Sequence, residues 1–274
     1  MDERVKRLWN SGRTAIGGWI LLPDEITTEI MAGQGFDIVT IDVQHGLIDY
    51  QKALAMLQAM NGSPTFPFAR VPWLDPAIIM KLLDAGFLGI ICPMINNAEE
   101  AGRLASYVRY PPLGERSFGP ARAGFIKDPA YGSKANDLIQ CLAMIETAEG
   151  YRNVEGIARV DGIDGVYIGP FDLTLGLYGN DLPLGIDREE PEMLEAIERI
   201  LNAAHAAGKK AGIHCGSPEY AARMADLGFD LVVVATDLVL FSSASKSTLE
   251  ATRRLTSGDD GAGEQSAPLS NAPY

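Results

Sequence analysis

Residues 65–95 read TFPFARVPWLDPAIIMKLLDAGFLGIICPMI, and this stretch decides the fold. It begins and ends with apolar runs, residues 65–72 and 88–95, that are rich in strand-forming side chains. Between them Asp75 is a suitable helix N-cap, a proline follows in the first helical position, apolar residues recur at helical spacing, and Gly86 is a typical stop. Strand, helix and strand in this order predict two parallel strands joined by a crossover helix.

The same alternation continues in both directions along the chain. Strand-like apolar runs recur at near-regular intervals, at residues 17–23, 36–43, 65–72, 88–95, 138–147, 164–170, 209–216 and 229–237. Helical patterns separate most of them, and several runs are uninterrupted, which is typical of parallel strands buried on both faces. The sequence therefore predicts an α/β fold, a single-domain (β/α)8 TIM barrel. An open doubly wound sheet is the alternative, but no GxGxxG motif follows the first run.

Some segments interrupt this alternation. We expect the barrel to span residues 1–256, and residues 257–274, rich in Gly, Ser, Ala and Pro, to form a disordered C-terminal tail without a function. Two connections, Tyr110–Tyr131 and Phe171–Arg188, are long for a compact domain, which favours a functional role for them.

Composition limits the class of protein. The 274 residues are 47% hydrophobic, enough for a sizeable core, and no window reaches the roughly 18 consecutive apolar residues of a membrane span. The charged N-terminus lacks the apolar run of a signal peptide, so we expect no membrane association and a cytoplasmic location. A formal net charge of −13 argues against nucleic acid as a partner. Cys92, Cys141 and Cys215 have no CxxC spacing, which favours buried free thiols over disulfides or a zinc site.

Polar side chains with chemical capacity gather where the predicted strands end. Active sites of (β/α)8 barrels lie at these carboxyl ends. The residues at or just after these strand ends are, in chain order, Trp19, Asp42, Gln44, His45, Arg70, Glu146, Asp172, His214, Cys215, Thr236 and Asp237. The sequence therefore predicts an active site at one end of the barrel.

Glu146 and Asp172 carry the most weight among these residues. Each carboxylate ends an apolar run, and the two runs are consecutive. Burying unpaired carboxylates is costly, and a divalent cation with oxygen ligands removes that cost. Two alternatives remain open: both residues are solvated loop acids, or they pair with Arg70.

His45, Arg70 and Trp19 each have a functional and a structural interpretation. His45 lies three residues after Asp42 and suits a general base oriented by a carboxylate, with a His bonded to a turn carbonyl as the alternative. Arg70 suits bidentate binding of a carboxylate or oxo group, or a salt bridge to Asp42 or Glu146. Trp19 either walls the pocket or packs in the core.

Three further observations bear on the chemistry. The turn Gly169-Pro170-Phe171-Asp172 could present backbone N–H groups to an anion. Lys209 and Lys210 begin a predicted strand, at the end of the barrel opposite to the predicted site, and no lysine lies at the carboxyl end of a strand, which disfavours Schiff-base chemistry. His214 and Cys215 are adjacent and cannot supply a four-ligand zinc site, which favours packing for both.

Several motifs in one order resemble the HpcH/HpaI aldolase family, the metal-dependent class II pyruvate aldolases. They are FDIVTIDVQHG, ARVPW, LLDAGFLGIICPMINNAEEA, YPPLGER, MIET and DGIDGVYIGPFDLTLGLYG, and the similarity covers about residues 5–255. The resemblance implies an aldehyde-lyase similar to 4-hydroxy-2-oxoheptanedioate aldolase. It would reversibly cleave 4-hydroxy-2-oxo acids to pyruvate or hydroxypyruvate and an aldehyde, through a metal-stabilised enolate.

The resemblance also implies a role for each matching residue. Glu146 and Asp172 match the ligands of a divalent metal, Mg²⁺, Mn²⁺ or Co²⁺. His45 matches the catalytic base, Asp42 the acid near it, and Arg70 the arginine that binds the oxo acid. The substrate would also contact Trp19, Gln44, Gly169, Pro170, Phe171 and Asp172. Asp84 matches an acid in the site of a neighbouring subunit, in a family that is typically hexameric, and we expect it at the bottom of its own barrel.

Three departures from the family pattern leave two alternative functions open. Gln44 stands where many members have Glu, Met144 where many have Gln, and Ser117 where Gly is usual. One alternative is a lyase of the citrate-lyase-β or malyl-coenzyme A type, although no basic cluster is present to hold the phosphates of coenzyme A. The other is a non-catalytic barrel that binds an oxo acid, which only Gln44 and Met144 support.

Overall fold

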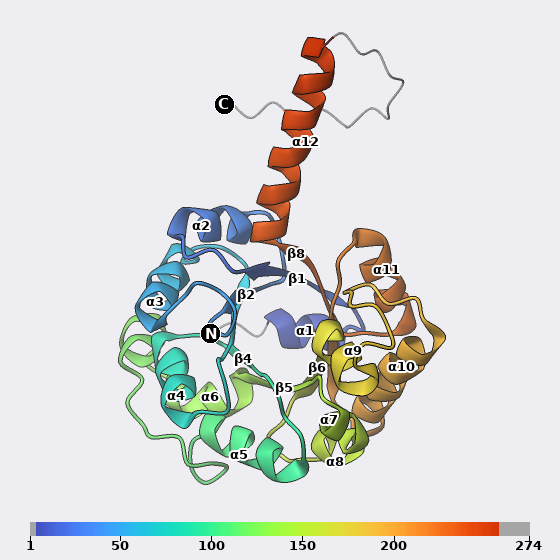
Figure 1. Cartoon of the computed structure of the whole chain (residues 1–274). Helices are drawn as coiled ribbons and strands as arrows, with labels where there is room; N and C mark the ends of the chain where they lie inside the picture. Colours follow the sequence, from blue (N-terminus) through green and yellow to red (C-terminus); the bar gives the residue numbers. More distant parts are fainter. Residues whose placement is uncertain (1–3, 258–274) are drawn as a thin grey trace. The chain divides into compact units, whose positions relative to one another are not determined.

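In the computed structural model, which describes residues 4–257, parallel strands close into a barrel in chain order (Figure 1). The strands are β1 (Ala15–Ile20), β2 (Ile38–Asp42), β3 (Phe66–Arg70), β4 (Gly89–Cys92), β5 (Gln140–Ile145), β6 (Gly165–Ile168), β7 (Lys210–His214) and β8 (Leu231–Thr236). Each strand pairs in parallel with the next, and β1 pairs with β8 to close the sheet. The predicted TIM barrel is therefore confirmed. Strands β2 to β8 lie inside their predicted runs, and β1 begins two residues before its run, which was predicted to start at Gly17.

Helices connect the strands, and α2 to α11 lie around them (Figure 1). They are α1 (Arg4–Asn10), α2 (Glu25–Gly33), α3 (Tyr50–Ala59), α4 (Pro76–Ala85), α5 (Ala98–Val108), the π-helical turn η1 (Ala123–Lys127), α6 (Tyr131–Leu138), α7 (Ala148–Arg152), α8 (Val154–Ala158), α9 (Pro170–Tyr178), α10 (Pro191–Ala206), α11 (Pro218–Leu227) and α12 (Asp237–Ser257). The described residues fall into two compact units, the first ending at Asp237 and the second beginning at Leu238. The expected tail after residue 257 lies outside the described residues.

The helix boundaries follow the capping signals in the sequence. The Asp75 carboxylate accepts a hydrogen bond from the Ala77 N–H at 2.8 Å at the start of α4, and Gly86 ends that helix with a φ of 110°. The Asn97 side chain accepts from the Glu100 N–H at 2.9 Å at the start of α5. These local signals set where α4 and α5 begin and where α4 ends.

The two-residue period of the strands separates an outer core from the barrel interior. On β3, Phe66 and Phe68 point into the interior cluster, and Arg70 follows at the same spacing. On β5, Met144 lies in that cluster and Glu146 follows two residues later. Chemically active residues therefore continue the inward-facing rows at the carboxyl ends of the strands.

Glycine makes room for the large interior rings. A Cβ at position 89 of β4 would lie 2.2 Å from the Phe68 ring, so this strand position needs a residue without a side chain. At the amino end of the barrel, Val5 and Trp9 of α1 join the interior cluster, and the Trp9 Nε1–H donates to the Asp230 carbonyl at 2.7 Å. The interior is therefore a packed core rather than a pore.

The prediction of a long loop over Phe171–Arg188 is wrong in its first half. Residues 170–178 form α9, with Pro170 preorganised in the first turn and Leu173 buried. Gly176 does not break this helix. It allows close packing instead, because a Cβ there would lie 3.1–3.3 Å from backbone atoms of residues 146–148.

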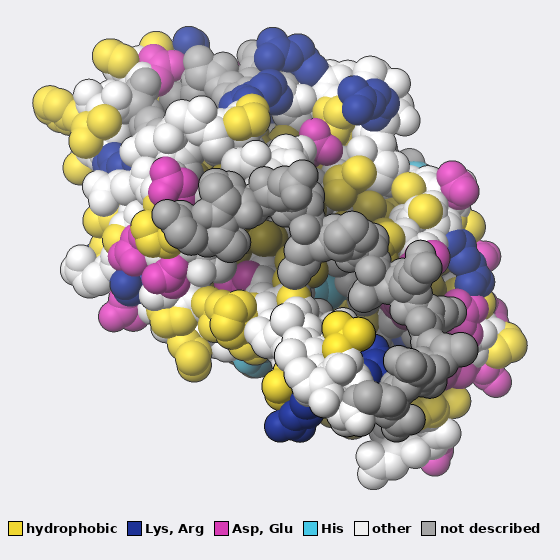
Figure 2. All heavy atoms as spheres, turned by 90° about the horizontal axis from the view of Figure 1, so that it is seen from above, with side chains coloured by type: hydrophobic (Ala, Val, Ile, Leu, Met, Phe, Trp, Pro, Cys, Tyr) yellow, Lys and Arg dark blue, Asp and Glu magenta, His cyan; other side chains and the backbone are white. Residues whose placement is uncertain are grey.

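Other expectations concern the surface and the cysteines. Both acidic and basic side chains occur on the face drawn in Figure 2. None of the helices in residues 4–257 is both long and apolar enough to cross a membrane. The three cysteines are buried free thiols, as predicted.

Candidate active site at the carboxyl ends of the strands

Arg70 and Asp42 form a buried ion pair on neighbouring strands. They are register partners at the ends of β3 and β2, so the sheet itself brings them together. The Arg70 Nε–H donates to Asp42 Oδ1 at 2.9 Å, and Nη2 contacts Oδ2. The Trp19 Nε1–H also donates to Oδ2, at 3.2 Å, and the Arg70 guanidinium lies 4.9 Å from the centre of the Trp19 ring. Arg70 was interpreted either as a substrate-binding residue or as a salt-bridge partner, and the structure shows its salt bridge to Asp42.

Asp42 also holds the turn that carries Gln44 and His45. Its Oδ1 accepts from the Gln44 N–H at 2.9 Å and the His45 N–H at 3.2 Å. Burial alone would raise the Asp42 pKa, but the Arg70 hydrogen bond and charge, with these two N–H donors, lower it below its usual value. The recorded contact is with the His45 backbone rather than its ring, and His45 is exposed. Asp42 therefore orients the turn, and the predicted carboxylate–imidazole pair is not formed.

Glu146 is a buried carboxylate with a strongly raised pKa. It is 3% exposed, and its Oε1 accepts a hydrogen bond from the Met94 N–H at 2.8 Å. Burial raises the Glu146 pKa to about 7, the Met94 N–H opposes this rise, and the charge of Asp172 adds to it. Asp172 thus contributes to the electrostatic environment of Glu146.

Asp172 lies in the first turn of α9, where it is exposed. The N-cap of that helix is Gly169, which has no side chain to cap the first N–H groups. A Cβ at Gly169 would lie 2.7 Å from Glu146 Oε2 and 2.4 Å from Met144 Cε. Glycine at this position thus keeps the start of α9 close to the Glu146 carboxylate.

The donor set of Glu146 and Asp172 fits a hard divalent cation. A buried carboxylate with a raised pKa, beside a second carboxylate, favours binding of positive charge. In residues 4–257 no group of three or more His, Cys, Asp or Glu residues is arranged to hold a metal ion. A cation at Glu146 and Asp172 would therefore need water or substrate oxygens to complete its coordination, as is usual for Mg²⁺.

His214 lies in the barrel interior beside the ion pair. From the sequence, packing was the favoured role for this residue. Its ring contacts Trp19 edge-on with centroids 5.1 Å apart, and Nδ1 is 3.2 Å from the Tyr167 hydroxyl. Burial and, to a smaller extent, the Arg70 charge lower the His214 pKa to about 4. His214 is therefore neutral at neutral pH and acts as a polar packing residue under the site.

We expect His214 to make the protein less stable in acid. Its pKa falls from 6.5 to about 4 on folding, so between these values the folded protein binds fewer protons than the unfolded chain. Its contribution to stability is present above pH 6.5 and is lost as the pH falls to about 4. The loss is roughly 3 kcal/mol at most. Urea unfolding at pH 7 and pH 4 should show a larger drop for the wild type than for His214→Phe, whereas equal drops would contradict this assignment.

Asp84 does not join the site of its own chain. It lies at the end of α4, at the opposite end of the barrel, and its Oδ1 accepts from Arg116 Nη2 at 2.6 Å. The Arg116 guanidinium is buried and stacks 4.4 Å from the centre of the Tyr110 ring. This arginine offsets the unfavourable position of a carboxylate at a helix C-terminus and anchors the connection that follows Tyr110.

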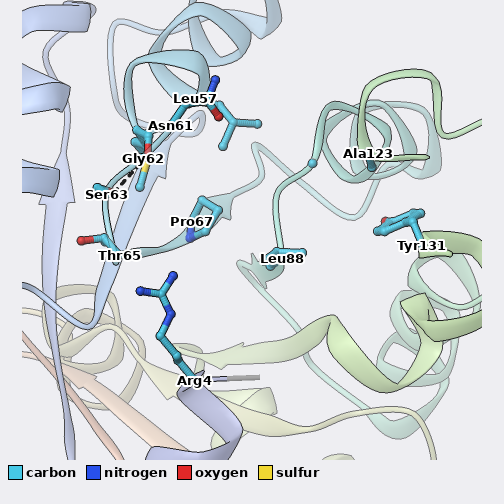
Figure 3. A pocket seen from close by; sticks show the side chains of 12 residues that line it. Arg4, Leu57, Asn61, Gly62, Ser63, Thr65, Pro67, Leu88, Ala123 and Tyr131 are labelled. Carbon is cyan, nitrogen blue, oxygen red and sulfur yellow. Dashed lines mark hydrogen bonds between the residues drawn. The ribbon is translucent and has the colours of Figure 1, made fainter. Parts of the chain in front are cut away.

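A cavity of about 220 Å³ lies near the amino ends of β3 and β4. Figure 3 shows Arg4, Ser63 and Thr65 on one side of it and Tyr131 on the other. None of the predicted site residues lines this cavity. In barrels this end serves stability, so we assign the cavity no catalytic role.

Two residues that touch the site, Tyr167 and Met94, were not predicted from the sequence. The period of β6 could have identified Tyr167, because it lies two residues before Gly169 on the inward-facing row. No sequence pattern predicted the contact of Met94 with Glu146, because this contact depends on a backbone φ of 58° at Met94.

Comparisons with known proteins agree with this geometry. The family model described as HpcH/HpaI aldolase/citrate lyase matches residues 15–244. The hydroxypyruvate/pyruvate aldolase of Rhizorhabdus wittichii is 44% identical over 253 residues, which cover 92% of this chain and 100% of that protein. The 4-hydroxy-2-oxo-heptane-1,7-dioate aldolase of Shigella flexneri is 37% identical over 251 residues, which cover 90% of this chain and 91% of that protein.

A solved structure with a similar fold belongs to the same family. The crystal structure of an HpcH/HpaI aldolase/citrate lyase family protein from Burkholderia cenocepacia J2315 has a TM-score of 0.84 and 28% identity, and the match covers 92% of this chain and 100% of that one. The aldolase relatives make this chain a carbon–carbon lyase of the aldolase class. The chain belongs to the HpcH/HpaI aldolase/citrate lyase family.

Proposed function

We propose that this enzyme is a metal-dependent aldolase that reversibly cleaves 4-hydroxy-2-oxo acids to pyruvate or hydroxypyruvate and an aldehyde, with Glu146 and Asp172 as the metal ligands. One observation carries the proposal: the Glu146 carboxylate is buried and lies against the start of α9, the helix whose first turn carries Asp172, so closely that a Cβ at Gly169 would lie 2.7 Å from Glu146 Oε2. The raised pKa of Glu146, to which the charge of Asp172 contributes, supports it. Mg²⁺, Mn²⁺ and Co²⁺ all suit these oxygen ligands. When bound, such a cation supplies Lewis-acid stabilisation of the negative charge that develops on the 2-oxo group.

Arg70 is proposed to bind the oxo acid with the part of its guanidinium that Asp42 does not use. The Asp42 contacts occupy Nε and Nη2, which fixes the plane of the group and leaves the Nη1 side for a substrate oxygen. This arrangement stabilises negative charge on the oxo group as the carbon–carbon bond breaks.

His45 is proposed as the base that takes the proton from the 4-hydroxyl group. It is exposed at the end of β2, and its backbone is held by Asp42, so its ring can reach a substrate above the barrel. The N–H groups of Phe171 and Asp172, at a helix start without a side-chain cap, are proposed to bind the substrate carboxylate. Trp19 and Gln44 complete the proposed binding site.

A substrate panel tests this proposal. The enzyme is incubated with pyruvate or hydroxypyruvate, a set of aldehydes and each of the three metals, and the products are identified by mass spectrometry. We expect 4-hydroxy-2-oxo acids that form only with a metal present. A catalytically silent oxo-acid-binding barrel would give no adduct with any aldehyde, and calorimetric binding of coenzyme A would instead favour the citrate-lyase-β or malyl-coenzyme A type.

We also propose that the enzyme is a homo-oligomer, a hexamer by resemblance to its family. The connection between α5 and α6 exposes large apolar side chains, which supports a subunit contact there: Leu113, Phe118, Phe125 and Ile126. In such an assembly Asp84 would act in the site of a neighbouring subunit. Light scattering measures the mass, and a monomer at assay concentration would exclude this role of Asp84. A cytoplasmic location stays a prediction from the sequence.

A further inference from the structure

The turn between β4 and α5 contains a strained residue next to the metal ligand. In residues 4–257, Met94 is the non-glycine residue recorded with a positive φ, at 58°. A side chain disfavours this left-handed conformation because its Cβ crowds the backbone, so a non-glycine residue keeps it only where the surroundings impose it.

The strained conformation directs one backbone group at Glu146. The Met94 N–H donates to Glu146 Oε1 at 2.8 Å, and this is the hydrogen bond recorded for the buried carboxylate within the described residues. The bond fixes one oxygen of the carboxylate and so determines where Oε2 points, toward Gly169 at the start of α9.

Asn96 holds the strained turn in place from two sides. Its Nδ2–H donates to the Met94 carbonyl at 2.9 Å, and its Oδ1 accepts from the Thr147 hydroxyl at 2.5 Å. Thr147 directly follows Glu146, so one side chain ties the strained peptide to the strand end that carries the ligand. The Asn96 backbone is itself fixed, because its N–H donates to Glu100 and its carbonyl accepts from Asn153, each at 2.8 Å.

We propose that Asn96 is a positioning residue for metal binding: it keeps Met94 in the left-handed conformation and thereby holds Glu146 in the orientation that a divalent cation requires. The inference rests on the proposed function, since it assumes that Glu146 is a metal ligand. Removing a residue that orients a metal ligand typically weakens metal affinity 10- to 100-fold.

The test measures the dissociation constant of Mn²⁺ by electron paramagnetic resonance, without substrate. Asn96→Ala is expected to raise this constant about tenfold. Two double variants then separate backbone strain from side-chain packing, because both remove the part of the Met94 side chain beyond Cβ. In Met94→Gly/Asn96→Ala, glycine adopts the left-handed conformation freely, and the affinity should return close to that of the wild type. In Met94→Ala/Asn96→Ala the strain remains, and the affinity should stay low.

Equal affinities of the two double variants, or an Asn96→Ala protein that binds Mn²⁺ like the wild type, would overturn the proposal. A second comparison keeps Asn96 and so does not depend on the folding of Asn96→Ala. Met94→Val should bind Mn²⁺ about tenfold more weakly than Met94→Gly, because a β-branched residue resists the left-handed conformation most, and equal affinities would contradict the role of strain. If the wild type binds no Mn²⁺, the proposed function fails, which is a different result from wild-type binding that is insensitive to residues 94 and 96.

Discussion

Glu146→Gln and Asp172→Asn should each lower kcat/KM for pyruvate release from a 4-hydroxy-2-oxo acid by roughly a thousandfold or more. Each change keeps the shape of the side chain but removes the charge that a divalent cation needs, and that cation contributes several kcal/mol of transition-state stabilisation. The measurement is a coupled assay of pyruvate at saturating metal. Glu149→Gln is the matched control, because Glu149 is an exposed acid three residues after Glu146. A small effect at Glu146 and Asp172, equal to that at Glu149, would contradict their assignment.

Arg70→Met should destabilise the protein by about 3–5 kcal/mol, because it leaves the buried Asp42 carboxylate without its partner. Activity should fall at least about a hundredfold as well, since Arg70 is proposed to stabilise charge on the oxo group. Urea unfolding and steady-state kinetics measure the two effects separately.

A double variant distinguishes these two roles of Arg70. In Asp42→Asn/Arg70→Met no buried charge is left unpaired, so most of the stability should return while the activity stays low. Arg103→Met is the surface control, because Arg103 is half exposed and lies 3.9 Å from Glu100. If Arg70→Met is as stable as the double variant, the ion pair does not have the assigned importance.

Much of the fold was predictable because strand and helix patterns repeat along the chain. Strands β2 to β8 lie inside their predicted apolar runs, β1 begins two residues before its run, and the cap at Asp75 starts a helix where expected. Strand ends also indicated the candidate site, because the two-residue period that buries Phe66 and Phe68 continues to Arg70. Helix α9 was missed: its one internal glycine, Gly176, resembles a break in the sequence but serves close packing.

The contacts within the site were less predictable, because they depend on backbone geometry and on competition between partners. Orientation of the His45 ring by Asp42 was one of two interpretations of the sequence, but Asp42 accepts its hydrogen bonds from Arg70, Trp19 and two backbone N–H groups of the turn. The Met94 N–H reaches Glu146 only through a left-handed backbone that the sequence does not encode in a recognisable motif.

Removal and return of the metal tests the central claim most directly. The enzyme is stripped with a chelator, dialysed and assayed for pyruvate release from a 4-hydroxy-2-oxo acid, before and after addition of Mg²⁺, Mn²⁺ or Co²⁺. We predict no pyruvate release from the stripped enzyme and recovery of activity with at least one of these cations. Full activity in the presence of excess chelator would contradict the assignment of Glu146 and Asp172 as ligands of a catalytic metal.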